Sequence, residues 1–165
     1  MPKKGYIYIF LKFFEINFET LGEKNTYIFV ILAKGVLMAK RVILVDDSKT
    51  ILATAEMALE DMMANGIIDF STYLNPAELL EDLLSGQEDY DLLISDINMA
   101  QMSGLDLAEQ LKSHDSFKNK PILILTTESS PEMKMRGKAI GVTGWMVKPF
   151  NDAKLVKAIQ MVLGL

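Results

Sequence analysis

Five polar side chains of the sequence have the types and spacing to form one chemical site. Asp46 and Asp47 follow an apolar run, Asp96 ends another, and Thr126 and Lys148 stand at the ends of two more. Three carboxylates that lie together repel one another unless a cation sits between them. Because no histidine or cysteine accompanies these oxygen ligands, the set favours Mg²⁺. A lysine and a hydroxyl beside that ion, without a glycine-rich loop, suit a single phosphoryl group, and Asp96 is the candidate nucleophile.

Asp96 stands out because of the residues before it. In DLLISDINMA, residues 91–100, a run of leucine and isoleucine that indicates a buried strand stops on this carboxylate. A charge at that position is costly unless something neutralises or uses it. Each of the five polar residues also has an ordinary interpretation by itself, since acidic pairs cap helices and Lys-Pro is common in turns. Their occurrence at the ends of four of the apolar runs favours a shared site.

Short apolar runs alternate with amphipathic segments along the chain from Arg41 onwards. This alternation predicts βαβ units and a mainly parallel sheet that helices cover on both faces. We therefore expect an α/β fold, a three-layer α/β/α, doubly wound domain whose ligand site lies at the carboxyl ends of five strands. Asn75, Ser130 and Asn151 are expected helix N-caps. The expected strands are 41–45, 67–73, 90–96, 121–127 and 144–150, and the expected helices are 49–64, 75–86, 104–114, 130–141 and 151–163.

Composition limits the classes of function. A chain of 165 residues, 50% of them hydrophobic, is long enough for one domain with a real core. The net charge of −5 argues against a nucleic-acid partner, whose binding needs a basic face. The absence of cysteine excludes disulfides and fits a cytoplasmic location. The uncharged apolar segment 26–33 is far shorter than the roughly 18 residues that span a bilayer, so we expect no membrane partner.

The first 37 residues differ in character from the rest. Met38 begins MAKRVILVDDSKT, which is how a small domain of this kind would start by itself. We therefore expect residues 1–37 to be an N-terminal extension outside the fold and residues 38–165 to form the domain. The mass of the natively expressed protein would test this division.

Four short motifs place the domain in a known family by resemblance. They are VDD at 45–47, SDINM at 95–99, LTTE at 125–128 and VKPF at 147–150. In this order they resemble the receiver domain of bacterial two-component response regulators, and more closely the stand-alone chemotaxis regulators of the CheY type. The resemblance covers residues 38–165. It implies a flavodoxin-like fold with the strand order 2-1-3-4-5.

The resemblance assigns roles to the carboxylates. It implies that Asp96 is the phosphoacceptor and that Asp47, Asp96 and the backbone carbonyl of Asn98 ligate Mg²⁺. Asp46 would hold a water bound to the metal. The resemblance also assigns to Asn98 and Glu128, which flank the site, the tuning of phosphoryl hydrolysis.

The remaining family positions concern the phosphoryl group and the response to it. Thr126 and Lys148 would contact the phosphoryl oxygens. Thr126 and Trp145 would form the switch, in which the aromatic side chain turns inward after phosphorylation. The bond before Pro149 is expected to be cis, which is rare enough to be informative.

Three positions depart from the family pattern. Ala100 stands where the family usually has proline, and Ser103-Gly104 stands where it usually has Asp-Gly. None of the expected ligands is lost, but the loop after Asp96 is affected. Trp145 is larger than the usual tyrosine or phenylalanine, which bears on the amplitude of the switch.

The expected function is that of a single-domain response regulator. It would accept a phosphoryl group from a histidine kinase, in chemotaxis by resemblance, and change its affinity for the flagellar motor switch protein or another downstream protein. The chain is not expected to be an enzyme beyond its own phosphoryl transfer and autodephosphorylation. A basic face is expected to serve the partners, although it could also be an ordinary solvated surface. It comprises Lys134, Arg136, Lys138, Lys154 and Lys157.

Two other classes of function stay open in the sequence. One is a receiver that shuttles phosphate to a histidine phosphotransfer protein in a multistep phosphorelay. The other is a hydrolase or mutase that uses an aspartyl phosphate, but such enzymes normally have a general-acid aspartate where this chain has Asn98. His114, the one histidine, is expected to be solvent-exposed and not catalytic.

Overall fold

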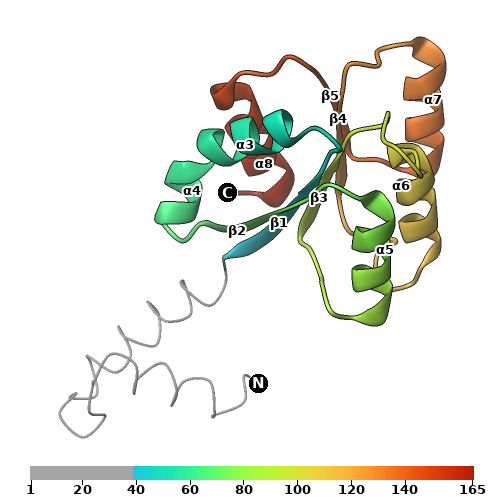
Figure 1. The fold of residues 1–165 in the computed structure, drawn as a ribbon, viewed down its shortest axis with the longest axis horizontal. Coiled ribbons are helices and arrows are strands. Elements are labelled where there is room, and N and C mark those ends of the chain that lie inside the picture. Colours follow the sequence, from blue (N-terminus) through green and yellow to red (C-terminus); the bar gives the residue numbers. More distant parts are fainter. Residues whose placement is uncertain (1–38) are drawn as a thin grey trace, which may run out of the picture. The chain divides into compact units, whose positions relative to one another are not determined.

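A computed structural model describes residues 39–165, and the prediction about residues 1–37 lies outside this range. Five parallel strands form one sheet in the order β2-β1-β3-β4-β5 (Figure 1). The predicted fold class and the strand order implied by the resemblance are therefore confirmed. The strands are β1 (Lys40–Val45), β2 (Ile68–Tyr73), β3 (Leu92–Ser95), β4 (Ile122–Thr126) and β5 (Gly144–Val147).

Helices alternate with these strands, and five of the six begin within one residue of a predicted start. The side chains of Asn75, Ser130 and Asn151 each accept a hydrogen bond from a backbone N–H in the first turn of the helix that follows. Pro76 and Pro131 occupy first helical positions, where no N–H is needed. The helices are α3 (Lys49–Ala58), α4 (Glu60–Ala64), α5 (Pro76–Ser85), α6 (Gly104–Ser113), α7 (Pro131–Ile140) and α8 (Asp152–Leu163).

The sheet is buried on both faces. Successive residues of a strand point to opposite faces, so Ile43 and Val45 join one core cluster while Val42 and Leu44 join the other. Helices α5 and α6 pack on the first face with α7 beside them, and α3, α4 and α8 pack on the second (Figure 1). This burial fixes the strands rigidly, and with them the polar residues at their carboxyl ends.

The segment 49–64 differs from its prediction as one helix. Leu59 interrupts it between α3 and α4, with φ −104° and ψ 3°. The N–H of Leu59 is shared between the carbonyls of Ala55 and Glu56, a pattern typical of helix ends, and its side chain is fully buried. Periodicity alone does not predict this break, because the apolar face continues through it.

None of the helices within residues 39–165 has both the length and the apolar character needed to cross a bilayer.

Candidate metal centre and phosphoacceptor site

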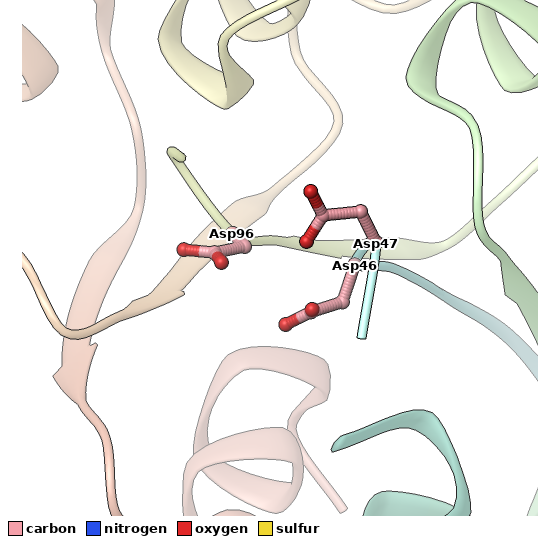
Figure 2. A group of neighbouring side chains, drawn as sticks. All are labelled: Asp46, Asp47 and Asp96. Atoms are coloured by element: carbon pink, nitrogen blue, oxygen red, sulfur yellow. The ribbon is translucent and has the colours of Figure 1, made fainter. Parts of the chain in front are cut away.

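The pairing of β1 with β3 brings the three aspartates together. Val45 and Ser95 are partners in the parallel register, so Asp46 and Asp96 come next to each other where the two strands end. The N–H of Asp96 extends this pairing by donating to the carbonyl of Val45 at 3.1 Å. One carboxylate oxygen from each of Asp46, Asp47 and Asp96 lies within 4.8 Å of the others (Figure 2).

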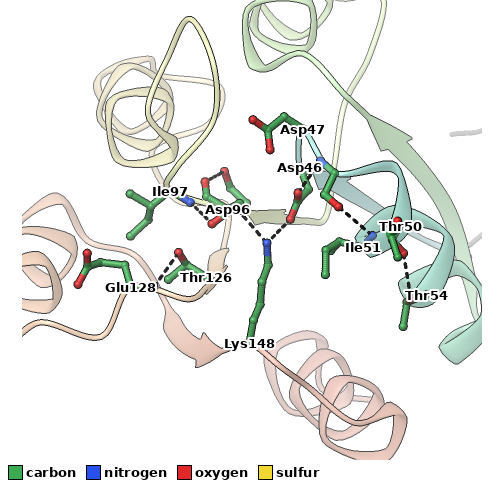
Figure 3. Close-up of polar contacts among 12 residues, drawn as sticks. Asp46, Asp47, Thr50, Ile51, Thr54, Asp96, Ile97, Thr126, Glu128 and Lys148 are labelled. Carbon is green, nitrogen blue, oxygen red and sulfur yellow. Dashed lines mark hydrogen bonds and ion pairs between the residues drawn. The ribbon is translucent and has the colours of Figure 1, made fainter.

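Lys148 lies between two of these carboxylates. It follows β5, and its ammonium group donates to Asp96 Oδ2 at 3.0 Å and to Asp46 Oδ2 (Figure 3). The side chains of Lys148, Asp46 and Asp96 are only 8%, 1% and 10% exposed. A buried ammonium group thus lies at the edge where the three carboxylates meet. Its contact with Asp46 joins residues that are 102 positions apart in the chain.

Burial and ion pairing shift the pKa values of this cluster in opposite directions. Burial raises the pKa of Asp46, and the hydrogen bond from Lys148 offsets that rise only in part. Burial lowers the pKa of Lys148, but its hydrogen bonds to Asp46 and Asp96 outweigh this and raise the pKa above its ordinary value. Lys148 therefore stays charged at neutral pH.

The remaining carboxylate oxygens are oriented by the backbone. Asp46 Oδ1 accepts from the N–H of Ser48 at 2.9 Å, and Asp96 Oδ1 accepts from the N–H of Ile97 at 2.7 Å. Asp47 is exposed, and within residues 39–165 no lysine or arginine pairs with it. Three carboxylates thus meet at this edge while the one ammonium group pairs with two of them, and the excess of negative charge on hard oxygen ligands fits a divalent cation such as Mg²⁺.

Thr126 lies at the same edge as the aspartates. It is the last residue of β4 and is fully buried. Its hydroxyl accepts from the N–H of Glu128 at 3.2 Å (Figure 3). Its carbonyl accepts from the N–H of Lys148 at 2.8 Å. The peptide bond between Lys148 and Pro149 is cis. The structure therefore brings all five polar residues of the sequence prediction to the carboxyl edge of one sheet.

Comparison of the sequence with models of known protein families shows which family has this arrangement. The model of the response regulator receiver domain matches residues 42–160. The chain belongs to the response regulator receiver domain family. It is 30% identical to the chemotaxis protein CheY1 of Helicobacter pylori over 124 residues, which are 75% of this chain and 97% of that protein. It is 27% identical to CheY-3 of Vibrio cholerae over 122 residues, which are 74% of this chain and 90% of that protein.

A solved structure supports the same assignment. The chemotaxis protein CheY4 of Vibrio cholerae is similar with a TM-score of 0.67 and 39% sequence identity, and the match covers 75% of this chain and 98% of that chain. The receiver domain described here is thus of the CheY type and a response regulator in a two-component system.

The loop after Asp96 packs closely against the start of α6. A Cβ atom on Gly104 would lie 1.7 Å from the backbone oxygen of Asp96, so only glycine fits there. The hydroxyl of Ser95 donates to the same oxygen at 2.8 Å, and Gly104 donates to the carbonyl of Ile97 at 3.0 Å. In the sequence Gly104 stands out only as part of a family motif, because a close backbone approach leaves no periodic signal. Asn98 lies exposed on this loop.

Glu128 lies in the segment between β4 and α7 of this receiver domain. Its carboxylate accepts from the N–H of Ser130 at 2.8 Å, and this hydrogen bond lowers the pKa of Glu128. Its backbone carbonyl accepts from the indole Nε1 of Trp145 at 3.0 Å. Trp145 is half-buried in β5 and is thus linked to the segment that follows Thr126.

Gly137 makes the space that Trp145 occupies. A Cβ atom on Gly137 would lie 2.9 Å from Cζ3 of Trp145 and 3.2 Å from Cγ2 of Val142. A glycine inside a helix normally weakens that helix. The structure adds a compensating role, because the larger aromatic side chain needs a position without a side chain on α7.

We expect the Gly137→Ala variant to be no more stable than the wild type. Alanine in place of an interior glycine normally stabilises a helix by about 1 kcal/mol, but here its Cβ would displace the indole. The emission of Trp145, the one tryptophan of the chain, should shift to the red. Chemical denaturation and fluorescence measure both effects, and the exposed Ala139→Gly on the same helix reports the effect of helix propensity alone. A stabilised variant with unshifted emission would contradict the role of Gly137.

The basic face differs from its prediction at one residue. Arg136 donates to Asp106 at 2.6 Å and to Glu109 at 3.4 Å, so this guanidinium ties α7 to α6. Arg136 therefore already has two carboxylate partners within the domain, although its side chain is 42% exposed. The other basic residues of the two helices make no ion pair within residues 39–165. They are Lys134, Lys138, Lys154 and Lys157. His114 is exposed, as expected, and its ring lies 5.5 Å from that of Phe117.

Proposed function

We propose that this receiver domain accepts a phosphoryl group on Asp96 from a histidine kinase and then changes its affinity for a downstream protein. The observation that carries the proposal is the buried ammonium group of Lys148 between Asp46 and Asp96, next to a third carboxylate. A metal ion and a lysine on one side of a carboxylate suit the charge of a transferring phosphoryl group. The proposal requires Mg²⁺, and the three carboxylates offer it a binding site.

The proposed transfer begins with Asp96. Its Oδ2 attacks the phosphorus of a phosphohistidine, the O–P bond forms, the P–N bond breaks, and the imidazole of the kinase leaves with the electron pair. Lys148 neutralises charge on the phosphoryl oxygens, and Thr126 contributes its hydroxyl to them. Mg²⁺, held by Asp47, Asp96 and the carbonyl of Asn98 with Asp46 on a bound water, would supply further charge neutralisation. The phosphoryl group is lost when water hydrolyses the acyl phosphate, which releases inorganic phosphate and restores the Asp96 carboxylate.

The same residues support a switch rather than an enzyme acting on a separate substrate. Residue 98 is asparagine, so the general acid of a phosphatase or mutase is missing from that position. We propose that Asn98 and Glu128 instead set the hydrolysis rate. Thr126 would move towards the phosphoryl group, and Trp145 would respond through the segment that includes Glu128, whose carbonyl it contacts.

We propose chemotaxis as the setting of the switch and the cytoplasm as its location. The similar proteins CheY1 and CheY-3 are chemotaxis proteins, which supports a chemotaxis kinase as the phosphodonor. The proposed downstream partner is the flagellar motor switch protein. The free lysines of α7 and α8 offer it a positively charged face. No nucleic acid or membrane is part of the proposal.

Phosphoryl transfer from a kinase tests the proposal. A chemotaxis histidine kinase labelled with radioactive phosphate should lose its label to the wild-type chain in the presence of Mg²⁺. The Asp96→Asn variant should accept none, while the matched control Asp115→Asn, with a side chain that is 94% exposed, should accept as much as the wild type. The phosphorylated chain should bind a peptide of the flagellar switch protein more tightly, by roughly tenfold or more. Transfer to Asp96→Asn would contradict the phosphoacceptor, and unchanged peptide affinity would contradict the motor partner.

A further inference from the structure

The loop 97–103 is built from two very tight turns. The N–H of Met99 donates to the carbonyl of Ile97 at 3.1 Å, and the N–H of Met102 donates to the carbonyl of Ala100 at 2.9 Å. Hydrogen bonds between residues i and i+2 define γ-turns. The second turn has Gln101 at its centre with φ 71°, a value that is strained for any residue with a Cβ atom. Such a conformation persists only where the surrounding structure holds it.

Ala100 provides the contacts that hold this turn. Its carbonyl accepts from Met102 within the turn, and its N–H donates to Asp47 Oδ2 at 3.3 Å, across 53 residues of sequence. Proline, which the family usually has at this position, carries no N–H and cannot make the second bond. The departure at Ala100 therefore adds a link between the loop and a carboxylate of the metal centre.

The link matters because the Asp47 carboxylate has few other partners among the described residues. Lys148 is engaged by Asp46 and Asp96, and within residues 39–165 the N–H of Ala100 is the one hydrogen-bond donor to the Asp47 carboxylate. A carboxylate offers about four lone-pair positions, so one weak hydrogen bond leaves room for a metal ion. The bond selects an orientation of an otherwise exposed side chain without blocking it.

We infer that the main-chain N–H of Ala100 is a positioning group for the metal centre: it orients Asp47 and ties the loop that carries Asn98 to the edge where Mg²⁺ binds. The inference rests on the proposed function, because that function supplies the metal. Hydrogen bonds that orient a metal ligand are typically worth tenfold or more in metal affinity. By reciprocity, metal binding at Asp47 orders the loop through the same bond.

Exchange of the Ala100 amide hydrogen tests the hydrogen bond without metal or phosphate. In a chelator, NMR should show faster exchange of this amide in Asp47→Ala than in the wild type. Equal rates would overturn the inference, whatever the outcome of the phosphorylation experiments. Addition of Mg²⁺ to the wild type should slow the exchange further, and a rate unaffected by saturating Mg²⁺ would also overturn it.

Magnesium affinity tests the consequence. Calorimetric titration of Mg²⁺ should give roughly tenfold weaker binding for Ala100→Pro, which lacks the N–H, and an affinity within about twofold of wild type for Ala100→Ser, which keeps it. Thermal unfolding in chelator identifies a proline variant that is misfolded, and the amide-exchange comparison then decides alone. Equal affinities of Ala100→Pro and wild type would overturn the inference, as would equal weakening in both variants. Because no phosphodonor is present, a failure of phosphoryl transfer leaves this test unaffected.

Discussion

Replacement of Lys148 with methionine is expected to lower the free energy of unfolding by about 3 kcal/mol in Mg²⁺-free buffer at neutral pH. The substitution keeps most of the side-chain volume but removes the cation between two buried carboxylates. Asp46, fully buried, would keep only the N–H of Ser48 as a partner. Urea denaturation of the metal-free protein measures the loss.

The effect of Lys148→Met should depend on pH in a defined direction. Burial already raises the pKa of Asp46, and removal of the ammonium group raises it further. A carboxyl whose pKa is higher in the folded than in the unfolded state loses stability as the pH rises through that interval. The penalty should therefore be smaller near about pH 4 than at neutral pH.

A surface lysine serves as the control for Lys148. Lys118 pairs with Asp115 at 2.8 Å, but these side chains are 52% and 94% exposed. Lys118→Met should change the unfolding free energy by no more than about 0.5 kcal/mol at either pH. Equal losses in the two variants would show that the buried lysine has no special role.

Replacement of Gly104 with alanine is expected to cost about 3 kcal/mol of stability and to disturb Asp96 at the same time. The added Cβ would lie 1.7 Å from the backbone oxygen of Asp96 and 2.7 Å from the hydroxyl of Ser95. Because the first contact is with the backbone, the strand end or the start of α6 has to move. Denaturation measures the stability, and the rate of phosphorylation by a small phosphodonor measures the displacement of the carboxylate.

Gly86→Ala separates this clash from ordinary backbone strain. Gly86 has φ 77°, but no heavy atom lies within 4 Å of the position that a Cβ atom would take there. The variant should lose only about 1 kcal/mol and phosphorylate at the wild-type rate. A Gly104→Ala variant that behaves like Gly86→Ala would contradict the close approach of α6 to Asp96.

Residue patterns predict the sheet and the place of the site because both follow from simple rules. Buried parallel strands are continuous apolar runs, and the side chains that follow them share an edge, so Asp46, Asp96 and Thr126 could be placed together from their positions in the chain. The caps Ser130 and Asn151 were predictable for the same kind of reason, since their chemistry is local.

The features that escaped prediction depend on contacts between distant segments. Arg136 is one of five residues of the basic face in the sequence, and only the packing of α7 on α6 places it beside Asp106. Gly137 looks like a defect in a helix until the indole of Trp145 lies against it. Ala100 is an unexplained departure from the family proline in the sequence, and only the fold shows that its N–H donates to Asp47. A main-chain donor carries no side-chain signal, so this contact could not be read from residue types.

The mass of the intact protein after incubation with acetyl phosphate decides whether Asp96 is the phosphoacceptor. With Mg²⁺ present, we expect a species heavier by one phosphoryl group, about 80 Da, that hydroxylamine removes and that peptide mapping assigns to Asp96. The species should be missing when the metal is chelated and from the Asp96→Asn variant. No added mass in the wild type, or an equal added mass in Asp96→Asn, would contradict the assignment of Asp96 as the phosphoacceptor.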